Sequence, residues 1–267
     1  MINLAQLHEQ VIPVVKAAGA YILEQYVSFS DQHIEVKGLH DLVSYVDKEA
    51  EDRLVADLSG LVPESGFITE EDESRTRAAE YNWIIDPLDG TTNFIHKVPT
   101  FSVSVALARG EEVVLGVVYE INRDECFSAY QGGGAFLNGT LIHVSQTPVL
   151  ADSLLATGFP FRKFDQMDEY LLVLKSLMQQ TRGIRRIGSA AVDLAYTACG
   201  RFDCFFEFNL NNYDMAAGVL LVKEAGGWVG DFQGGNRMLT KGNVIAGNPV
   251  IAGEVFEEIK KHFSQAT

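Results

Sequence analysis

Two aspartates in the first half of the chain have a spacing that could support metal chemistry. Asp86 and Asp89 lie three positions apart, directly after the apolar residues 83–85, which predict a buried strand. Pro87 fixes a backbone dihedral between them, and Gly90 lets the backbone approach a ligand closely. We therefore expect the strand to end at Asp86 and a sharp turn to follow over residues 87–92, which would put two carboxylates at one strand end, with backbone amides after Gly90 that could hold an oxyanion.

Two other acidic segments could contribute ligands to the same site. Residues 69–73 include Glu70 and follow the apolar residues 66–68, and carboxylates gathered at a strand end are costly unless solvent or cations compensate them. A solvated loop is the alternative interpretation of this acidic run. Asp214 opens an apolar helix, where a capping role and a ligand role are compatible. Carboxylate oxygens suit Mg²⁺ or Mn²⁺ far better than Zn²⁺.

The charge balance restricts the kinds of partner. The 267 residues include 21 Lys and Arg and 36 Asp and Glu, which gives a formal net charge of −15 at pH 7. Because no basic run interrupts this balance, we expect no direct binding to nucleic acid or to an anionic membrane. A substrate that is itself an anion would need divalent cations to invert the field at the site.

Cysteine usage and the hydrophobic pattern predict the compartment. Cys126, Cys199 and Cys204 fit neither a disulfide framework nor a zinc site, so we expect buried free thiols. Charged residues interrupt the apolar positions near the N-terminus, and no stretch approaches the length of a membrane span. A reduced, cytoplasmic environment follows from this pattern.

The elements that must position the acidic residues differ between the two halves. Apolar residues recur every three or four positions over residues 4–22 and again over 50–58, which predicts two amphipathic helices, the second with Asp47 in its first turn. Residues 66–144 instead contain short runs rich in Val, Ile, Phe and Tyr, with an Asn-Gly tight-turn signal at 138–139. The first half therefore predicts helices packed on a mostly antiparallel sheet.

After about residue 150, strands and helices alternate. Helices are predicted over residues 167–178, 190–198, 213–225 and 249–262. Arg185 and Arg186 are expected at an ordinary exposed strand edge. No linker or repeat separates the halves, so we predict one compact unit with two subdomains, 1–147 and 148–267, and a site on the seam between them.

Four motifs together resemble the inositol monophosphatase family of magnesium-dependent, lithium-sensitive phosphatases. They are DLVSYVDKEAE at 41–51, GFITEEDE at 66–73, WIIDPLDGTTNFIHKVPTFSVSVAL at 83–107 and YDMAAGVLLVKEAGG at 213–227. Their order along the chain matches the family. The resemblance implies an α+β and α/β layered sandwich in the order α-β-α-β-α, with an antiparallel sheet and helices in the N-terminal half and alternating α/β elements in the C-terminal half. It also implies a homodimer.

The resemblance implies a metal site built from carboxylates and one carbonyl. Glu70, Asp86 and the backbone carbonyl of Leu88 would hold one Mg²⁺, while Asp86, Asp89 and Asp214 would hold a second. The site would take about two or three Mg²⁺ ions in all. Mn²⁺ would be a substitute for Mg²⁺, and Li⁺ and Ca²⁺ would be inhibitors.

Further residues are assigned catalytic and substrate roles through the same resemblance. Thr91, with Asp47 behind it, would orient and deprotonate the attacking water, and Glu70 belongs to the same catalytic group. The amides of Gly90 and Thr91 would hold the phosphate. The remaining contacts to the substrate would come from Asp89, Ala190 and Glu207. An exposed position at a strand end is the alternative interpretation of Glu207.

The predicted activity is hydrolysis of inositol monophosphate, or of a similar small polyol phosphate, by a metal-activated water that releases inorganic phosphate. Asn93-Phe94 after the paired threonines favours this substrate class. The same chemistry on histidinol phosphate, fructose 1,6-bisphosphate or a 3′-phosphonucleotide remains an alternative. A haloacid-dehalogenase-type nucleophile is disfavoured. Such an enzyme needs two aspartates two positions apart, whereas Asp86 and Asp89 are three positions apart. In a different class, the chain would be a regulatory or binding protein with a vestigial phosphatase site.

Overall fold

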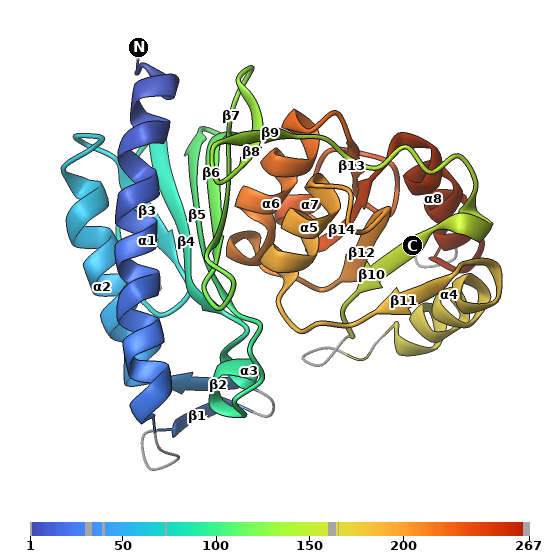
Figure 1. The fold of residues 1–267 in the computed structure, drawn as a ribbon, viewed down its shortest axis with the longest axis horizontal. Coiled ribbons are helices and arrows are strands. Elements are labelled where there is room, and N and C mark those ends of the chain that lie inside the picture. Colours follow the sequence, from blue (N-terminus) through green and yellow to red (C-terminus); the bar gives the residue numbers. More distant parts are fainter. Residues whose placement is uncertain are drawn as a thin grey trace.

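Helices and sheets alternate in five layers across the molecule (Figure 1). The computed structural model describes residues 2–29, 34–38, 41–72, 74–159, 164 and 166–263, with the backbone alone described at 34–38 and 41–43. The first layer is a pair of helices, α1 (Leu4–Ser28) and α2 (Tyr45–Ser59), which pack on each other and on the first sheet. A small antiparallel hairpin, β1 (Ile34–Gly38) and β2 (Asp41–Ser44), lies between them in the chain.

The second layer is a seven-stranded sheet in the order β3-β4-β5-β6-β7-β8-β9. Only the first pair of strands is parallel, so the predicted mostly antiparallel sheet is confirmed. The short helix α3 (Thr91–Ile95) separates β4 from β5. The strands are β3 (Gly66–Thr69), β4 (Tyr81–Asp89), β5 (Ser102–Arg109), β6 (Glu112–Glu120), β7 (Glu125–Tyr130), β8 (Gly134–Leu137) and β9 (Thr140–Ile142).

The remaining layers come from the second half of the chain. A five-stranded mixed sheet has the order β11-β10-β12-β14-β13. Its strands are β10 (Leu154–Thr157), β11 (Gly183–Arg185), β12 (Cys204–Phe208), β13 (Trp228–Gly230) and β14 (Asn243–Gly247). The helices are α4 (Met167–Gln180), α5 (Ala190–Ala198), α6 (Asn212–Glu224), α7 (Met238–Lys241) and α8 (Pro249–Phe263), with a 3₁₀ turn at Leu150–Asp152.

Helices α5 and α6 form the middle layer and contact both sheets. Every residue of α5 is buried, and α6 is buried from Met215 to Val222. A helix that is apolar on all sides is expected to be covered on all sides. The largest apolar cluster lies around these two helices, a second joins α1 and α2 to the first sheet, and a third joins α4 and α8 to the second sheet. The predicted α-β-α-β-α sandwich is therefore confirmed.

The strand that carries the paired aspartates is longer than the sequence pattern suggests. We predicted a strand at 83–85 that turns immediately after Asp86, whereas β4 continues to Asp89. Its register against β5 shifts between Asp86 and Asp89, so a bulge absorbs Pro87, which has no N–H to donate to a ladder. The turn begins at Gly90, where φ is +99°. The two carboxylates thus lie at either end of a bulge.

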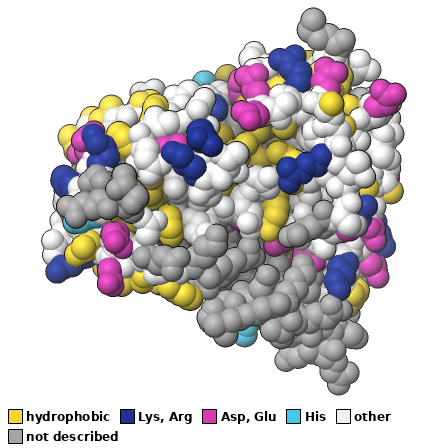
Figure 2. Space-filling view, turned by 180° about the vertical axis from the view of Figure 1, so that it is seen from behind, with side chains coloured by type: hydrophobic (Ala, Val, Ile, Leu, Met, Phe, Trp, Pro, Cys, Tyr) yellow, Lys and Arg dark blue, Asp and Glu magenta, His cyan; other side chains and the backbone are white. Residues whose placement is uncertain are grey.

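Several observations bear on the membrane, cysteine and charge predictions. No helix in the described ranges is long and apolar enough to cross a membrane. Cys126, Cys199 and Cys204 are free thiols, as predicted, but only Cys126 and Cys204 are buried; the prediction of burial is wrong for Cys199, which is partly exposed. On the face drawn in Figure 2, Lys and Arg side chains lie in several separate groups. The absence of nucleic-acid binding and the subdomain boundary at 147/148 stay predictions.

Candidate active site

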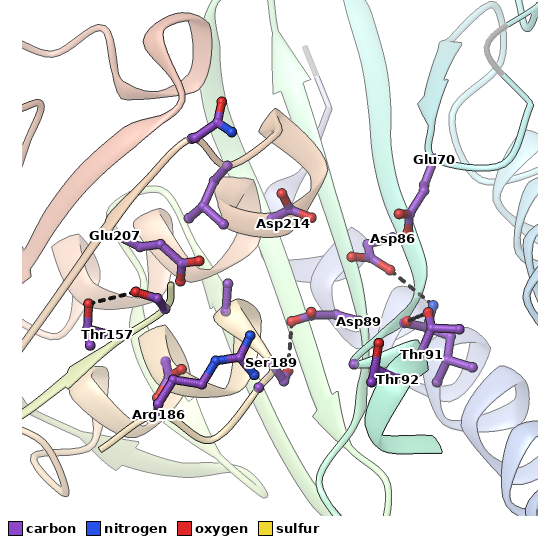
Figure 3. Close-up of a pocket in the computed structure, with 18 of the residues that line it drawn as sticks. Glu70, Asp86, Asp89, Thr91, Thr92, Thr157, Arg186, Ser189, Glu207 and Asp214 are labelled. Carbon is purple, nitrogen blue, oxygen red and sulfur yellow. Dashed lines mark hydrogen bonds between the residues drawn. The ribbon is translucent and has the colours of Figure 1, made fainter. Parts of the chain in front are cut away.

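A cavity of about 510 Å³ opens where the first sheet, the middle helices and the second sheet meet (Figure 3). Most of the predicted site residues line it, although they come from both halves of the chain. They are Glu70, Asp86, Leu88, Asp89, Gly90, Thr91, Ala190, Glu207 and Asp214. Asp47 does not line the cavity and lies behind Thr91, in the order that the sequence predicted.

Glu70 and Asp86 are neighbours because β3 and β4 run parallel and in register. Thr69, the last residue of β3, pairs with Ile85, so Glu70 directly after β3 and Asp86 on β4 both bring a carboxylate to the cavity. The two side chains share a hydrogen bond. Burial, reinforced by the other nearby carboxylates, raises the pKa of both groups well above their usual range. A divalent cation would favour the charged forms and reverse these shifts.

Asp89 joins the two halves of the molecule. Its Oδ2 accepts hydrogen bonds from the Ser189 hydroxyl and from the Ala191 N–H, both at 2.7 Å, at the start of α5. Ser189 is also the N-cap of α5 and accepts from the Val192 N–H. Burial raises the pKa of Asp89 even though these hydrogen bonds lower it. The carboxylate is therefore oriented by the second half while its backbone belongs to the first sheet.

Gly90 is required by both its conformation and its surroundings. Its φ of +99° lies in the left-handed region, and an added Cβ would stand 3.1 Å from the Thr100 carbonyl oxygen and 3.3 Å from that of Gly188. A side chain would be strained and crowded there. Glycine at this position lets α3 begin directly beside the paired aspartates.

Asp47 and Thr91 form a buried pair next to the carboxylates. Asp47 Oδ2 accepts hydrogen bonds from the Ser44 N–H and hydroxyl, which fix the carboxylate in a capping box at the start of α2. Asp47 Oδ1 lies 3.0 Å from the Thr91 hydroxyl, which is also 3.0 Å from the Leu88 carbonyl oxygen. Burial raises the pKa of Asp47 although its hydrogen bonds lower it. A more basic carboxylate is a better proton acceptor.

Asp214 uses the same local device as Asp47. It is the third residue of α6, and its Oδ2 accepts the N–H of the N-cap residue Asn211 at 2.5 Å. The sequence left capping and metal binding as compatible roles, and the helix indeed places Asp214 both in its first turn and on the cavity. In Figure 3 it lies across the cavity from Glu70.

Glu207 lies deeper in the cavity and belongs to β12. It is 5 % exposed, so the alternative of an exposed strand-end residue is wrong. Burial raises its pKa to about 8, with Asp214 and Asp89 adding to the shift and Arg186 opposing it. Its carboxylate occupies the space over Gly158 where a side chain would otherwise be. Ala190 is the first residue of α5 and borders the same space.

The structure adds cavity residues that the sequence pattern did not single out. Arg186 is exposed, as predicted, but it also lines the cavity and is the one Lys or Arg among the described lining residues. Asp193 on α5 lines it too, and its buried Oδ1 has no hydrogen-bond partner within the described part of the chain. The motif GSAAVD at 188–193 was the available signal, since it places two polar side chains around an apolar helix start.

The donor set fits a hard divalent cation. All side-chain donors of the predicted ligand set are carboxylate oxygens, the type that Mg²⁺ prefers. Over the described ranges, no three His, Cys, Asp or Glu side chains stand together in a ready-made coordination geometry. Glu70 and Asp86 are hydrogen-bonded to each other, and a cation held by both would replace that contact.

Comparison with known proteins gives consistent results over the full length. The chain is 40% identical over 265 residues to an inositol-1-monophosphatase of Mesorhizobium japonicum, covering 99% of both chains. It is 43% identical over 267 residues to the Nus factor SuhB of Pseudomonas aeruginosa, covering 98% of this chain and 96% of that one. The crystal structure of extragenic suppressor protein suhB from Bartonella henselae superimposes with a TM-score of 0.91 at 41% identity, covering 95% of this chain and 98% of that one.

The family assignment rests on a match along almost the whole sequence. The inositol monophosphatase family is matched over residues 3–266. This range includes all the predicted site residues and all five layers of the fold. The chain therefore belongs to the inositol monophosphatase family and is a phosphatase.

Proposed function

We propose that the protein hydrolyses inositol monophosphate or a similar small polyol phosphate in a Mg²⁺-dependent reaction that releases inorganic phosphate. The observation that carries this proposal is the position of the Thr91–Asp47 pair, 3.0 Å apart, beside a cavity lined by carboxylates from both halves of the chain. Thr91, which contacts the proposed proton acceptor Asp47, and the carboxylates that suit a cation thus border the same space. Relatives named inositol-1-monophosphatase support the substrate class.

The cation ligands would be Glu70, Asp86 and the Leu88 carbonyl for one Mg²⁺, and Asp86, Asp89 and Asp214 for another. Bound Mg²⁺ would lower the pKa of a water and neutralise charge on the phosphoryl oxygens. About two or three ions would bind per site. We also propose that Mn²⁺ substitutes for Mg²⁺ and that Li⁺ and Ca²⁺ inhibit.

Thr91 and Asp47 would take the proton of the attacking water. The Thr91 hydroxyl has a single hydrogen, which can be donated either to Asp47 or to the Leu88 carbonyl. When the hydrogen is donated to Asp47, the hydroxyl oxygen is available to accept a hydrogen from a water in the cavity. Asp47 is held by Ser44 and would receive the proton through Thr91. Glu70 acts with this pair as a ligand on the same side of the cavity.

The substrate would lie between the carboxylate end and the second sheet. The amides of Gly90 and Thr91, at the start of α3, would hold the phosphate. Glu207 and Asp89 would accept hydrogen bonds from hydroxyl groups of the polyol, with Ala190 against its carbon skeleton. The oxygens of a carboxyl group accept hydrogen bonds from an alcohol whether the group is ionised or protonated. Arg186 lies close enough to Glu207 for its positive charge to lower the pKa of that carboxyl group.

Two other interpretations are less well supported. Histidinol phosphate, fructose 1,6-bisphosphate and 3′-phosphonucleotides would use the same chemistry, but the relatives named inositol-1-monophosphatase favour the inositol ester. A vestigial site in a regulatory protein is disfavoured because several buried carboxylates with raised pKa values would destabilise the fold without a cation. The relative named Nus factor SuhB leaves a second, regulatory role open beside phosphatase activity. A homodimer and a cytoplasmic location remain part of the proposal.

The test is phosphate release from inositol, histidinol, sugar and nucleotide phosphates, with Mg²⁺ and with a chelator. We expect turnover of the polyol phosphate with Mg²⁺ only. Asp89→Asn should abolish this turnover while the fold persists, whereas Asp152→Asn, which alters an exposed ion pair with Arg182, should not. Normal turnover by Asp89→Asn would refute the ligand set. Preferential turnover of another ester would refute the substrate class, and no turnover of any ester would leave only the regulatory role.

A further inference from the structure

The loop that carries Glu70 is attached to helix α2 by a buried carboxylate. Glu51 is 1 % exposed, and its Oε2 accepts the N–H of Glu71, the residue next to Glu70, at 2.8 Å. Its other oxygen, Oε1, accepts the Arg75 Nε at 3.2 Å. Both oxygens of Glu51 therefore hold the segment that follows β3.

Arg75 completes this attachment from the loop side. Its guanidinium also bonds Asp52 Oδ1 at 2.6 Å and lies 3.6 Å from Asp72 Oδ2. The Arg75 side chain is 21% exposed, whereas that of Glu51 is 1% exposed, so the cation neutralises a buried charge from the solvent side. Removing one partner of such a pair would leave the other buried and uncompensated.

The attachment also relates the two sides of the site. Asp47 and Glu51 are four residues apart on α2 and therefore lie on the same face of the helix. One helix thus holds the proton acceptor behind Thr91 and, a turn later, the loop that presents Glu70. The same loop also has a local hydrogen bond, from the Thr69 hydroxyl to the Asp72 carbonyl oxygen.

We propose that Glu51 and Arg75 are positioning residues that hold the Glu70 carboxylate in place for cation binding. Neither side chain is among the residues that line the cavity, so they act through the hydrogen bond to the Glu71 N–H, directly beside Glu70. Without them, ordering Glu70 would cost conformational entropy each time a cation binds. The inference rests on the proposed function only in taking Glu70 as a cation ligand.

The experiment measures cation binding directly, by the electron paramagnetic resonance signal of free Mn²⁺, together with the Mg²⁺ dependence of phosphate release. Glu51→Gln keeps an oxygen for the Glu71 N–H but loses the charge that pairs with Arg75. We expect about a 10- to 100-fold weaker affinity for at least one Mn²⁺, because groups that orient a ligand contribute on this scale. The maximal rate should recover at saturating Mg²⁺.

Two control variants separate positioning from general stability. Glu125→Gln breaks an Arg–carboxylate pair with Arg201, at 2.5 Å, on β7 and away from the cavity. It should lower the melting temperature with Mn²⁺ affinity unchanged. Arg75→Lys keeps the charge and should partly restore affinity relative to Arg75→Gln, which tests the proposal if Glu51→Gln does not fold.

The outcomes distinguish this inference from the proposed function. If Glu70→Gln binds Mn²⁺ as tightly as the wild type, Glu70 is no ligand, and both proposals are refuted. If Glu70→Gln weakens binding but Glu51→Gln and Arg75→Gln do not, the positioning role alone is wrong. Weakened binding in the Glu51 and Arg75 variants, with normal binding in Glu125→Gln, supports it.

Discussion

A single methyl group at Gly158 should separate recognition of the polyol from phosphate chemistry. A Cβ built on Gly158 would stand 1.9 Å from Glu207 Oε1 and 2.2 Å from Oε2. Side-chain contacts of this kind are essentially never below 3.0 Å, so the carboxylate would have to move by roughly 1 Å. The backbone at Gly158 has no positive φ, and alanine can adopt it. The substitution therefore acts on Glu207.

The size of the effect follows from this displacement. A misplacement of about 1 Å in a substrate-positioning group can cost roughly 100-fold in rate, or about 2.7 kcal/mol. We expect Gly158→Ala to lower kcat/KM for inositol monophosphate by about that factor. An ester whose alcohol has no further hydroxyl group, such as p-nitrophenyl phosphate, should change by less than about twofold, because Glu207 has no hydroxyl to bind there.

Steady-state kinetics on both esters at saturating Mg²⁺ is the assay. Gly253→Ala in α8 is the matched control, since nothing lies within 4 Å of a Cβ at that position. In a Glu207→Ala background the new methyl group has room, so Gly158→Ala should add no further loss. Equal losses on both esters, or losses that add in the double variant, would refute the reasoning.

Two further predictions concern proton transfer and pH. Asp47→Asn should slow turnover by at least about 100-fold while Mn²⁺ affinity stays within about threefold. The reason is that Asp47 contacts Thr91 but does not line the cavity. An equal loss of Mn²⁺ binding would give Asp47 a different role. The pKa of Glu207 is raised from 4.5 to about 8, so its stabilising contribution is present below pH 4.5 and is lost as pH rises to about 8. With chelator present, the free energy of unfolding of the wild type should therefore fall more steeply with pH across this window than that of Glu207→Gln, by up to about 1.4 kcal/mol per pH unit. Parallel curves of unfolding free energy against pH for the two proteins would contradict this prediction.

Local pattern was sufficient to predict most elements. The alternation of strands and helices after residue 150 predicted helices at 190–198 and 249–262, which agree with α5 and α8 to within a residue. The Asn-Gly signal at 138–139 does join β8 to β9, with φ of 48° and 79°. The hairpin at 34–44 and helix α3 were not predicted. Both are short, and short elements depend on their surroundings more than on their own sequence.

The contacts that orient the site were the part that local pattern could not supply. Glu51 meets Glu71 across 20 positions, and Ser189 meets Asp89 across 100. Which residues form such pairs depends on the order of the layers. A short stretch of a single sequence does not reveal that order. The acidic motifs and the family resemblance identified the residues that line the site. The topology determines the hydrogen-bond partner of each carboxylate oxygen. The complete burial of α5 had a sequence signal, since its residues are apolar on nearly every side.

The bonds made by Asp89 have a consequence for how the site can be altered. Its backbone position is set by β4 of the first sheet, whereas both hydrogen bonds to its Oδ2 come from the start of α5. A change in the packing of α5 against β12 or α6 would therefore reach this carboxylate without touching any ligand. Asp214, on α6, would move with the same layer. The middle helices thus orient Asp89 and carry Asp214, two of the proposed ligands of the second cation, while β3, β4 and α2 position Glu70, Asp86 and Asp47.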